Sequence, residues 1–119
     1  MKDYLSRLPN DFPDELLQKG KSLKHIGLSC LVWNRENALE VVEFFSTSDY
    51  AILGGDVYVM SGSNLKSTSD SWFVDENDVS WDEYVNMARN KANVYINQYN
   101  NNNGDNFYYS IIFSDKGKM

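Results

Sequence analysis

The sequence predicts an α+β fold, in which a small and mostly antiparallel sheet of three or four strands packs against two main helices. Two segments repeat apolar residues at helical spacing, and a segment near the C-terminus follows the two-residue period of a strand. The 119 residues are a common size for one domain, and a hydrophobic content of 42% is enough for a core. We therefore expect a single domain over residues 1–119, with residues 1–12 and 114–119 irregular or frayed.

The clearest helix begins after Ser80, because Ser80 and Glu83 have the spacing of a capping box. Apolar residues then recur at steps of three and four: Trp81, Tyr84, Val85, Ala88, Ala92, Tyr95, Ile96 and Tyr99. A second helix is predicted over residues 35–46, where Asn34 is a good N-cap and the apolar stripe is wide. The width of that stripe indicates a deeply packed helix.

The middle of the chain predicts a pair of strands. Residues 50–60 have the composition of a strand that is interrupted or bent at Gly54 and Gly55. Residues 61–70 are rich in serine, threonine, asparagine and glycine, which predicts a loop. The short apolar segment 71–75 then predicts a strand that pairs antiparallel with the second half of the first one.

The remaining segments give weaker signals. Pro13 and Gly20 suit the start and the end of a short helix. Residues 25–33 are ambiguous between a strand and an irregular lead-in, because their alternation is imperfect. The asparagine run at 100–103 predicts a flexible loop, and residues 107–113 predict one strand.

Charge and composition limit the classes of function. The net charge of −6 disfavours direct binding to a phosphate backbone and would attract a basic partner. The chain has no apolar run of the length that a membrane-spanning helix or a signal peptide needs. A single cysteine, Cys30, cannot form an internal disulfide and fits a reducing compartment. We expect a cytoplasmic protein with neither a membrane nor a nucleic acid as its direct partner.

The residue patterns of catalysis and metal binding are absent from the sequence. His25 and Cys30 are the only histidine and cysteine, and their separation of five residues is not evidence of a nucleophile and its base. No paired-cysteine, paired-histidine or EF-hand pattern is present. Gly54 and Gly55 lack the pattern of a phosphate loop, and a bulge or kink explains them better. We expect a protein that is not an enzyme and that has no cofactor or metal.

The segment 67–88 suggests a protein-binding surface. It combines acidic and aromatic side chains and contains no lysine or arginine. Aromatic anchors in a charged surround are typical of binding hot spots. The candidate partner-binding residues are Asp70, Trp72, Asp75, Glu76, Asp78, Trp81, Asp82 and Glu83. The alternative is that the acids favour the helix dipole or face solvent, while the aromatics belong to the core.

A family resemblance enters at the block Leu-Gly-Gly-Asp-Val-Tyr, residues 53–58. This block follows a helix and precedes Trp72 and a helix that starts Trp-x-Glu-Tyr at residue 81. The order resembles the immunity protein 40 family of bacterial polymorphic toxin systems, over roughly residues 25–100. The resemblance implies an α+β protein that binds and neutralises a cognate toxin. The matching positions are Gly54, Gly55, Asp56, Tyr58 and Trp72.

The resemblance leaves several questions open. It does not say whether the matching residues contact the toxin or hold the fold, and it does not give the chemistry of the toxin. A nuclease toxin would be basic, which the acidity of this chain would complement. A small-ligand-binding or regulatory protein-interaction module is the alternative function, and an unrecognised enzyme is a third. Both a monomer and a homodimer that pairs through an open sheet edge fit the sequence.

Overall fold

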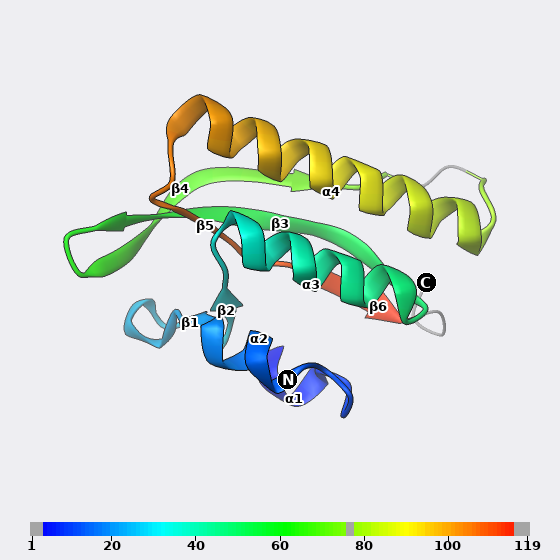
Figure 1. Ribbon diagram of the computed structural model, residues 1–119, viewed down its shortest axis with the longest axis horizontal. Helices are drawn as coiled ribbons and strands as arrows, with labels where there is room; N and C mark the ends of the chain where they lie inside the picture. Colours follow the sequence, from blue (N-terminus) through cyan, green and yellow to red (C-terminus); the bar gives the residue numbers. More distant parts are fainter. Residues whose placement is uncertain (1–3, 76–77, 116–119) are drawn as a thin grey trace.

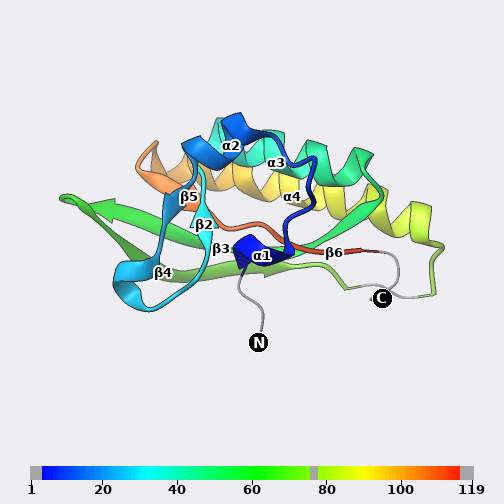
Figure 2. The ribbon, with the colours of Figure 1, turned by 90° about the horizontal axis from the view of Figure 1, so that it is seen from below.

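The fold has two layers, with a curved antiparallel sheet beneath a pair of adjacent helices (Figure 1; Figure 2). The computed structural model describes residues 4–75 and 78–115. In chain order the elements are α1 (Tyr4–Arg7), α2 (Asp14–Lys19), β1 (Lys21–Ser22), the 3-10 turn η1 (Lys24–Ile26), β2 (Leu31–Val32), α3 (Arg35–Thr47), β3 (Tyr50–Ser61), β4 (Asn64–Phe73), α4 (Trp81–Asn103), β5 (Phe107–Tyr109) and β6 (Ile112–Asp115). The predicted α+β fold, with two main helices on a small sheet, is confirmed.

The long strand β3 organises the main sheet. It pairs with β4 on one side and with β5 and β6 in succession on the other, and every pairing is antiparallel. β3 is not interrupted at the glycine pair, but its pairing register is irregular there, with shifts on both sides of Gly54 and Gly55. A second, two-stranded sheet joins β1 to β2.

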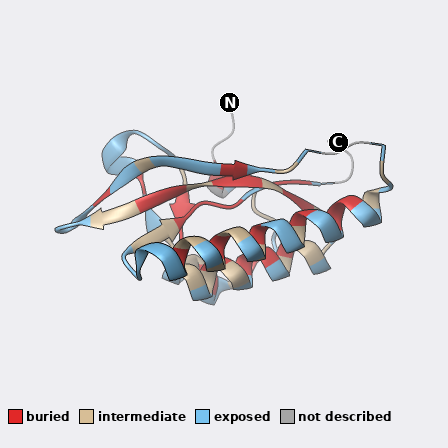
Figure 3. Ribbon diagram, turned by 90° about the horizontal axis from the view of Figure 1, so that it is seen from above, coloured by how far each residue is buried: buried red, intermediate tan, exposed pale blue. Residues whose placement is uncertain are grey.

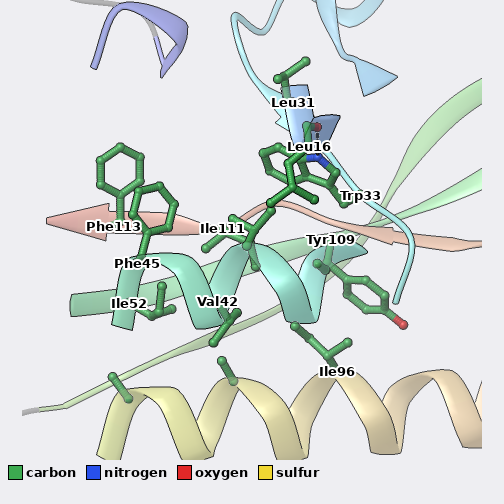
Figure 4. Packing of buried hydrophobic residues seen from close by; sticks show 14 of the residues in the cluster. Leu16, Leu31, Trp33, Val42, Phe45, Ile52, Ile96, Tyr109, Ile111 and Phe113 are labelled. Carbon is green, nitrogen blue, oxygen red and sulfur yellow. Dashed lines mark hydrogen bonds between the residues drawn. The ribbon is translucent and has the colours of Figure 1, made fainter. Parts of the chain in front are cut away.

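The main core lies between α3, α4 and the sheet. Each helix begins where the sequence predicts: Asn34 Oδ1 accepts a hydrogen bond from the Asn37 amide at 2.9 Å, and Ser80 Oγ accepts one from the Glu83 amide at 3.2 Å. Figure 4 shows how side chains from α3 meet those of β6, and the rings of Phe45 and Phe113 stack with centroids 4.1 Å apart. No described helix is both long and apolar enough to span a membrane.

A second, smaller core covers the opposite face of the sheet near the β3–β4 hairpin. Leu23 and Val32, from the segment that contains β1 and β2, pack against Tyr58 and Leu65 of the hairpin. Val57 belongs to the main core, so the adjacent residues Val57 and Tyr58 point to opposite faces, as strand geometry requires. The sheet therefore has helices over one face and a partial cover over the other.

The prediction of a loop over the whole of residues 61–70 is wrong. β4 already begins at Asn64, and the hairpin turn contains Gly62 at φ +62. The polar composition misled the prediction because only two residues of β4, Leu65 and Trp72, are buried. Figure 3 shows that β4 is mostly exposed, in contrast to β3. A strand at the border of a sheet with a solvated face needs few apolar residues.

The predicted C-terminal elements also need correction. Residues 100–103 are the last turn of α4 and not a loop. The buried Asn100 side chain favours this by donating a hydrogen bond to Asp105 and accepting one from the Tyr109 hydroxyl. The strand predicted over 107–113 is divided into β5 and β6. β6 extends to Asp115, so the first two residues of the segment expected to be frayed pair with β3.

The N-terminal segment is not the irregular arm that the sequence suggested. It contains α1, and the side chains of Tyr4 and Phe12 are buried in the main core. Both rings pack near Trp33, which precedes α3. The predicted short helix between Pro13 and Gly20 is confirmed as α2. The ambiguous segment 25–33 contains part of η1 and the short strand β2.

Candidate functional site

The glycine pair of the motif lets β3 lie very close to β4 and to the β5–β6 connection. A Cβ on Gly55 would lie 2.1 Å from the Ser110 carbonyl oxygen and 2.5 Å from the ring of Trp72. Gly54 has φ +152, and a Cβ there would lie 2.3 Å from the Trp72 carbonyl oxygen. No side chain fits at either position without moving the backbone of a neighbouring strand. The pair therefore has a packing role.

Asp56 and Tyr58 continue this structural role. The Ser110 hydroxyl accepts a hydrogen bond from the Asp56 amide at 2.8 Å, and the Ser110 amide donates to the Asp56 carbonyl at 3.0 Å. Tyr58 is buried in the smaller core, and burial raises the pKa of its phenol. The motif thus builds the junction between β3, β4 and the β5–β6 connection.

β4 contains an irregular bulge at residues 68–70. Three residues of β4 stand opposite Val57 alone, and Ser69 has φ +69. The Thr68 hydroxyl donates to the Val57 carbonyl at 2.9 Å, which fastens the bulge to β3. Asp70 is exposed and accepts a hydrogen bond from the Tyr99 hydroxyl at 2.8 Å. The pKa of Tyr99 is raised, mainly by burial and to a smaller extent by this hydrogen bond.

The two tryptophans of the predicted surface hold elements together. Trp72 is 5% exposed, and its ring stacks on Tyr95 of α4 at 4.9 Å. Trp81 is half-buried and donates its indole N–H to Asp49 Oδ1 at 2.6 Å. That bond ties the start of α4 to the turn between α3 and β3. Trp72 lies in the core, as the alternative interpretation of these aromatics holds.

The acids of the predicted segment gather where β4 leads into α4. Asp75, Asp78, Asp82 and Glu83 are all exposed, and Glu76 lies outside the described residues. Asp49 joins them through its bond to Trp81. We call this set of five exposed acids, Asp49, Asp75, Asp78, Asp82 and Glu83, the acidic end. Figure 1 shows this end of the molecule at the right, beside the start of α4.

Phe73 lies among the aromatics of the segment 67–88 but is not one of its predicted partner-binding residues. Phe73 is 63% exposed, although Trp72 beside it is buried. Met87 and Val94, on the outer side of α4, are 44% and 54% exposed. Strand geometry could have predicted the exposure of Phe73, because adjacent residues of a strand point to opposite faces, so a buried Trp72 implies that Phe73 points away from the core. The position of β4 at the border of the sheet was needed to interpret it.

The two residues considered for catalysis serve other contacts. His25 is exposed and pairs with the Leu65 carbonyl at 3.0 Å, while the Cys30 thiol donates to the Leu31 carbonyl. Burial raises the pKa of Cys30 to about 11, so the thiol is protonated at neutral pH and is a weak nucleophile. Within the described residues, no group of three or more histidine, cysteine or acidic residues could hold a metal ion.

A surface groove of about 510 Å³ lies between the N-terminal segment and β2. Its lining is mainly apolar and comprises Leu8, Pro9, Asn10, Phe12, Asp14, Leu17 and Leu31. Ligand sites usually add a few convergent polar groups to such an apolar lining. Here the polar lining residues are Asn10 and Asp14.

Comparison with known proteins gives one positive result. The family model described as immunity protein 40 matches residues 22–113 of this chain. That range includes the glycine motif, the acidic end and all of α3 and α4. Searches of curated proteins and of solved structures found no match.

Proposed function

The chain belongs to the immunity protein 40 family, and from this membership we propose that it binds and neutralises a cognate bacterial toxin without catalysing a reaction itself. The proposed protein is one domain over residues 1–119 that acts in the cytoplasm of the cell that produces the toxin. The toxin belongs to a polymorphic toxin system, and its contact surface is basic.

The acidic end is the observation that supports the proposed binding surface. Its members come from the α3–β3 turn, the β4–α4 connection and the first turn of α4. Of these, Glu83 is held by the Ser80 hydroxyl, which donates to Glu83 Oε1 at 3.2 Å. Exposed like charges that the fold brings together increase the rate of encounter with an oppositely charged protein. A leaky complex would leave free toxin, so affinity in the nanomolar range or tighter is expected.

The residues of the predicted surface divide into two groups under this proposal. Asp75, Asp78, Asp82 and Glu83 are exposed and form the part that meets the toxin, and Glu76 stays in the proposal on its sequence position. Asp70 extends this surface along β4. The buried Trp72, the half-buried Trp81 and the glycine motif position the surface rather than contact the partner.

A co-expression test examines the proposal. The C-terminal domain encoded by the gene immediately upstream is produced in a host cell with and without this protein, and survival is scored. We expect survival only with this protein. The variant Asp75→Lys, Asp78→Asn, Asp82→Asn raises the net charge by four. It should lower the association rate constant with the purified toxin domain several-fold at low salt. Asparagine is chosen at 78 because Asp78 has φ +53, which asparagine tolerates.

A matched control makes the same charge change elsewhere. Asp11→Lys, Glu36→Gln, Glu40→Gln also raises the net charge by four, and these exposed acids lie outside the acidic end. If the two triple variants slow association equally, total charge is responsible and the acidic end is not the contact surface. If this protein neither binds the upstream domain nor protects against it, the proposed function is wrong.

The surface groove beside β2 supports a second candidate function, a small-ligand-binding or regulatory module. The mainly apolar lining of the groove fits a small apolar ligand. Leu31→Gln places a polar group in the wall of the groove and should abolish a thermal shift caused by such a ligand. Toxin neutralisation that survives this substitution separates the two functions.

A further inference from the structure

Three exposed apolar side chains lie on the two elements that flank the acidic end, and the Lys91–Phe73 contact links these elements. They are Phe73 at the end of β4 and Met87 and Val94 on α4. Met87 and Val94 are seven residues apart and therefore lie on one side of the helix. These are three of the six large apolar side chains that are exposed among the described residues. We call Phe73, Met87 and Val94 the apolar strip.

Lys91 joins the two elements of the strip. It stands between Met87 and Val94 on the same side of α4, and its ammonium group lies 5.5 Å from the centre of the Phe73 ring. A cation over an exposed aromatic ring contributes little stability, because water solvates both groups. The Lys91 ammonium group can therefore leave the Phe73 ring at small cost.

The strip adjoins the acidic end on two sides. Glu83 lies one helical turn before Met87 on the same side of α4. Asp75 follows Phe73 by two residues along the chain. A partner that covers the strip therefore also meets carboxylates, and its matching rim must carry basic side chains.

We propose that the apolar strip is the centre of the toxin interface and seats an apolar side chain of the toxin that basic residues surround. This inference rests on the proposed function and names the contacts within its surface. The arrangement has the anatomy of a binding hot spot, with an aromatic and a methionine at the centre and charges at the rim. Lys91 moves away from Phe73 when the toxin binds, since a basic rim repels it.

Alanine substitutions test the centre of the interface. The probe is the C-terminal domain encoded immediately upstream, co-expressed with the wild-type chain, separated from it in denaturant and refolded. Phe73→Ala and Met87→Ala should each weaken its binding by about 30-fold or more, the size of a hot-spot effect. The control is Leu28→Ala, because Leu28 is 43% exposed and lies outside the strip. Its affinity should stay within about 2-fold of the wild type, as for a residue outside the interface.

Lys91→Glu supplies a second, independent readout. Replacing the cation that lies over Phe73 with an acid should raise the association rate constant by about 3-fold in 50 mM salt, and the gain should shrink in 200 mM salt. Thermal unfolding of each variant verifies that the fold is kept. A decrease in the association rate constant would show that the toxin rim is not basic and would overturn the proposal.

The outcomes separate the strip from the function. If the wild type binds and neutralises the domain while Phe73→Ala and Met87→Ala bind as tightly as the wild type, the strip is not the interface, although the function stands. If the wild type fails to bind, the function itself is wrong. Light scattering tests a second copy as the occupant: a wild-type dimer that Phe73→Ala converts to a monomer, with toxin affinity unchanged, overturns the proposal.

Discussion

The two borders of the main sheet are built in opposite ways. The border formed by β5 and β6 is covered by the N-terminal segment and by the residue that follows β2 (Figure 1). The covering hydrogen bonds run from Tyr4 Oη to the Ile111 carbonyl at 2.8 Å, from Arg7 Nη2 to the Phe113 carbonyl at 3.1 Å, and in both directions between the Trp33 and Tyr109 backbones at 3.0 and 2.8 Å. The side chains on both sides of this border, among them Trp33 and Tyr109, belong to the main hydrophobic core.

The border formed by β4 is covered much less: among the described elements, His25 of η1 contacts the Leu65 carbonyl at 3.0 Å. Two features disfavour the pairing of this border with another strand: the bulge at residues 68–70 and Lys91 above Phe73. Bulges and lysines are common devices against unwanted strand pairing at a sheet border. The difference shows which border stabilises the fold and which one, under the proposed function, is left for a partner. Substitutions at the covered border should change stability, and those at the open border should change binding.

The largest expected effect is that of Trp33→Ala at the covered border. Trp33 is fully buried and donates its indole N–H to the Leu16 carbonyl at 2.7 Å. Its removal leaves a cavity and takes one hydrogen bond from the Leu16 carbonyl, which keeps its bond from the Gly20 amide at 3.1 Å. The free energy of unfolding should fall by about 4 kcal/mol in urea titrations, mainly because of the cavity. Trp81→Ala, at the half-buried tryptophan of the acidic end, should cost about 2 kcal/mol or less. An equal cost at both positions would contradict the distinction between the covered border and the exposed start of α4.

Gly55→Ala tests the junction between the two borders. The new Cβ would clash with the Ser110 backbone on one side and with the Trp72 ring on the other. Relief of both clashes requires backbone movement, so the free energy of unfolding should fall by about 3 kcal/mol. Gly62→Ala is the control, because no atom lies within 4 Å of its Cβ position. The free energy of unfolding should fall by only about 1 kcal/mol there, which is the cost of an alanine at the positive φ of +62.

The sequence predicted those elements whose signals are local. The start of α4 follows from Ser80 and Glu83, three residues apart, and the start of α3 from Asn34. β4 was missed over most of its length because a border strand with one solvated face has the composition of a loop. The covering role of Tyr4 could not be predicted, since its partner Ile111 is 107 residues away in the chain.

The candidate site was predictable to a similar degree. The acids around the start of α4 are exposed as a sequence pattern alone would suggest, because they flank a capped helix. The division between Trp72 and Phe73 required the pairing register of β4, which places Trp72 opposite Gly55 and Phe73 opposite Gly54. The bond between Trp81 and Asp49 spans 32 residues and has no local signal.

The same chemical change at each border gives a smaller but cleaner test. Tyr4→Phe leaves the buried Ile111 carbonyl without its hydrogen bond, and the free energy of unfolding should fall by about 1.5 kcal/mol. Tyr99→Phe removes the bond to the exposed Asp70, which water can replace, and should cost about 0.5 kcal/mol or less. Equal losses in urea titrations would indicate that the two borders are equally solvated.

The smallest expected effect is a difference in alkaline stability at Cys30, on the covered side of the molecule. Burial raises the pKa of this thiol from 9.0 to about 11. The unfolded chain therefore releases the thiol proton at a lower pH than the folded chain does, so unfolding becomes more favourable as the pH rises. The contribution of Cys30 is fully present below pH 9 and is lost as the pH approaches 11.

Urea titrations of the wild type and of Cys30→Ala between pH 7 and pH 10.5 measure this loss. Burial also raises the pKa values of Tyr4 and Tyr109, but both tyrosines are present in each protein, so their effect largely cancels in the comparison. The wild type should lose stability more steeply than Cys30→Ala above pH 9, and the two curves should run parallel below pH 8. Parallel curves over the whole range would mean that solvent reaches Cys30 in the folded protein. The cover on that side of the sheet would then be open in solution, and the contrast between the two borders would be weaker than the contacts of Tyr4 and Trp33 indicate.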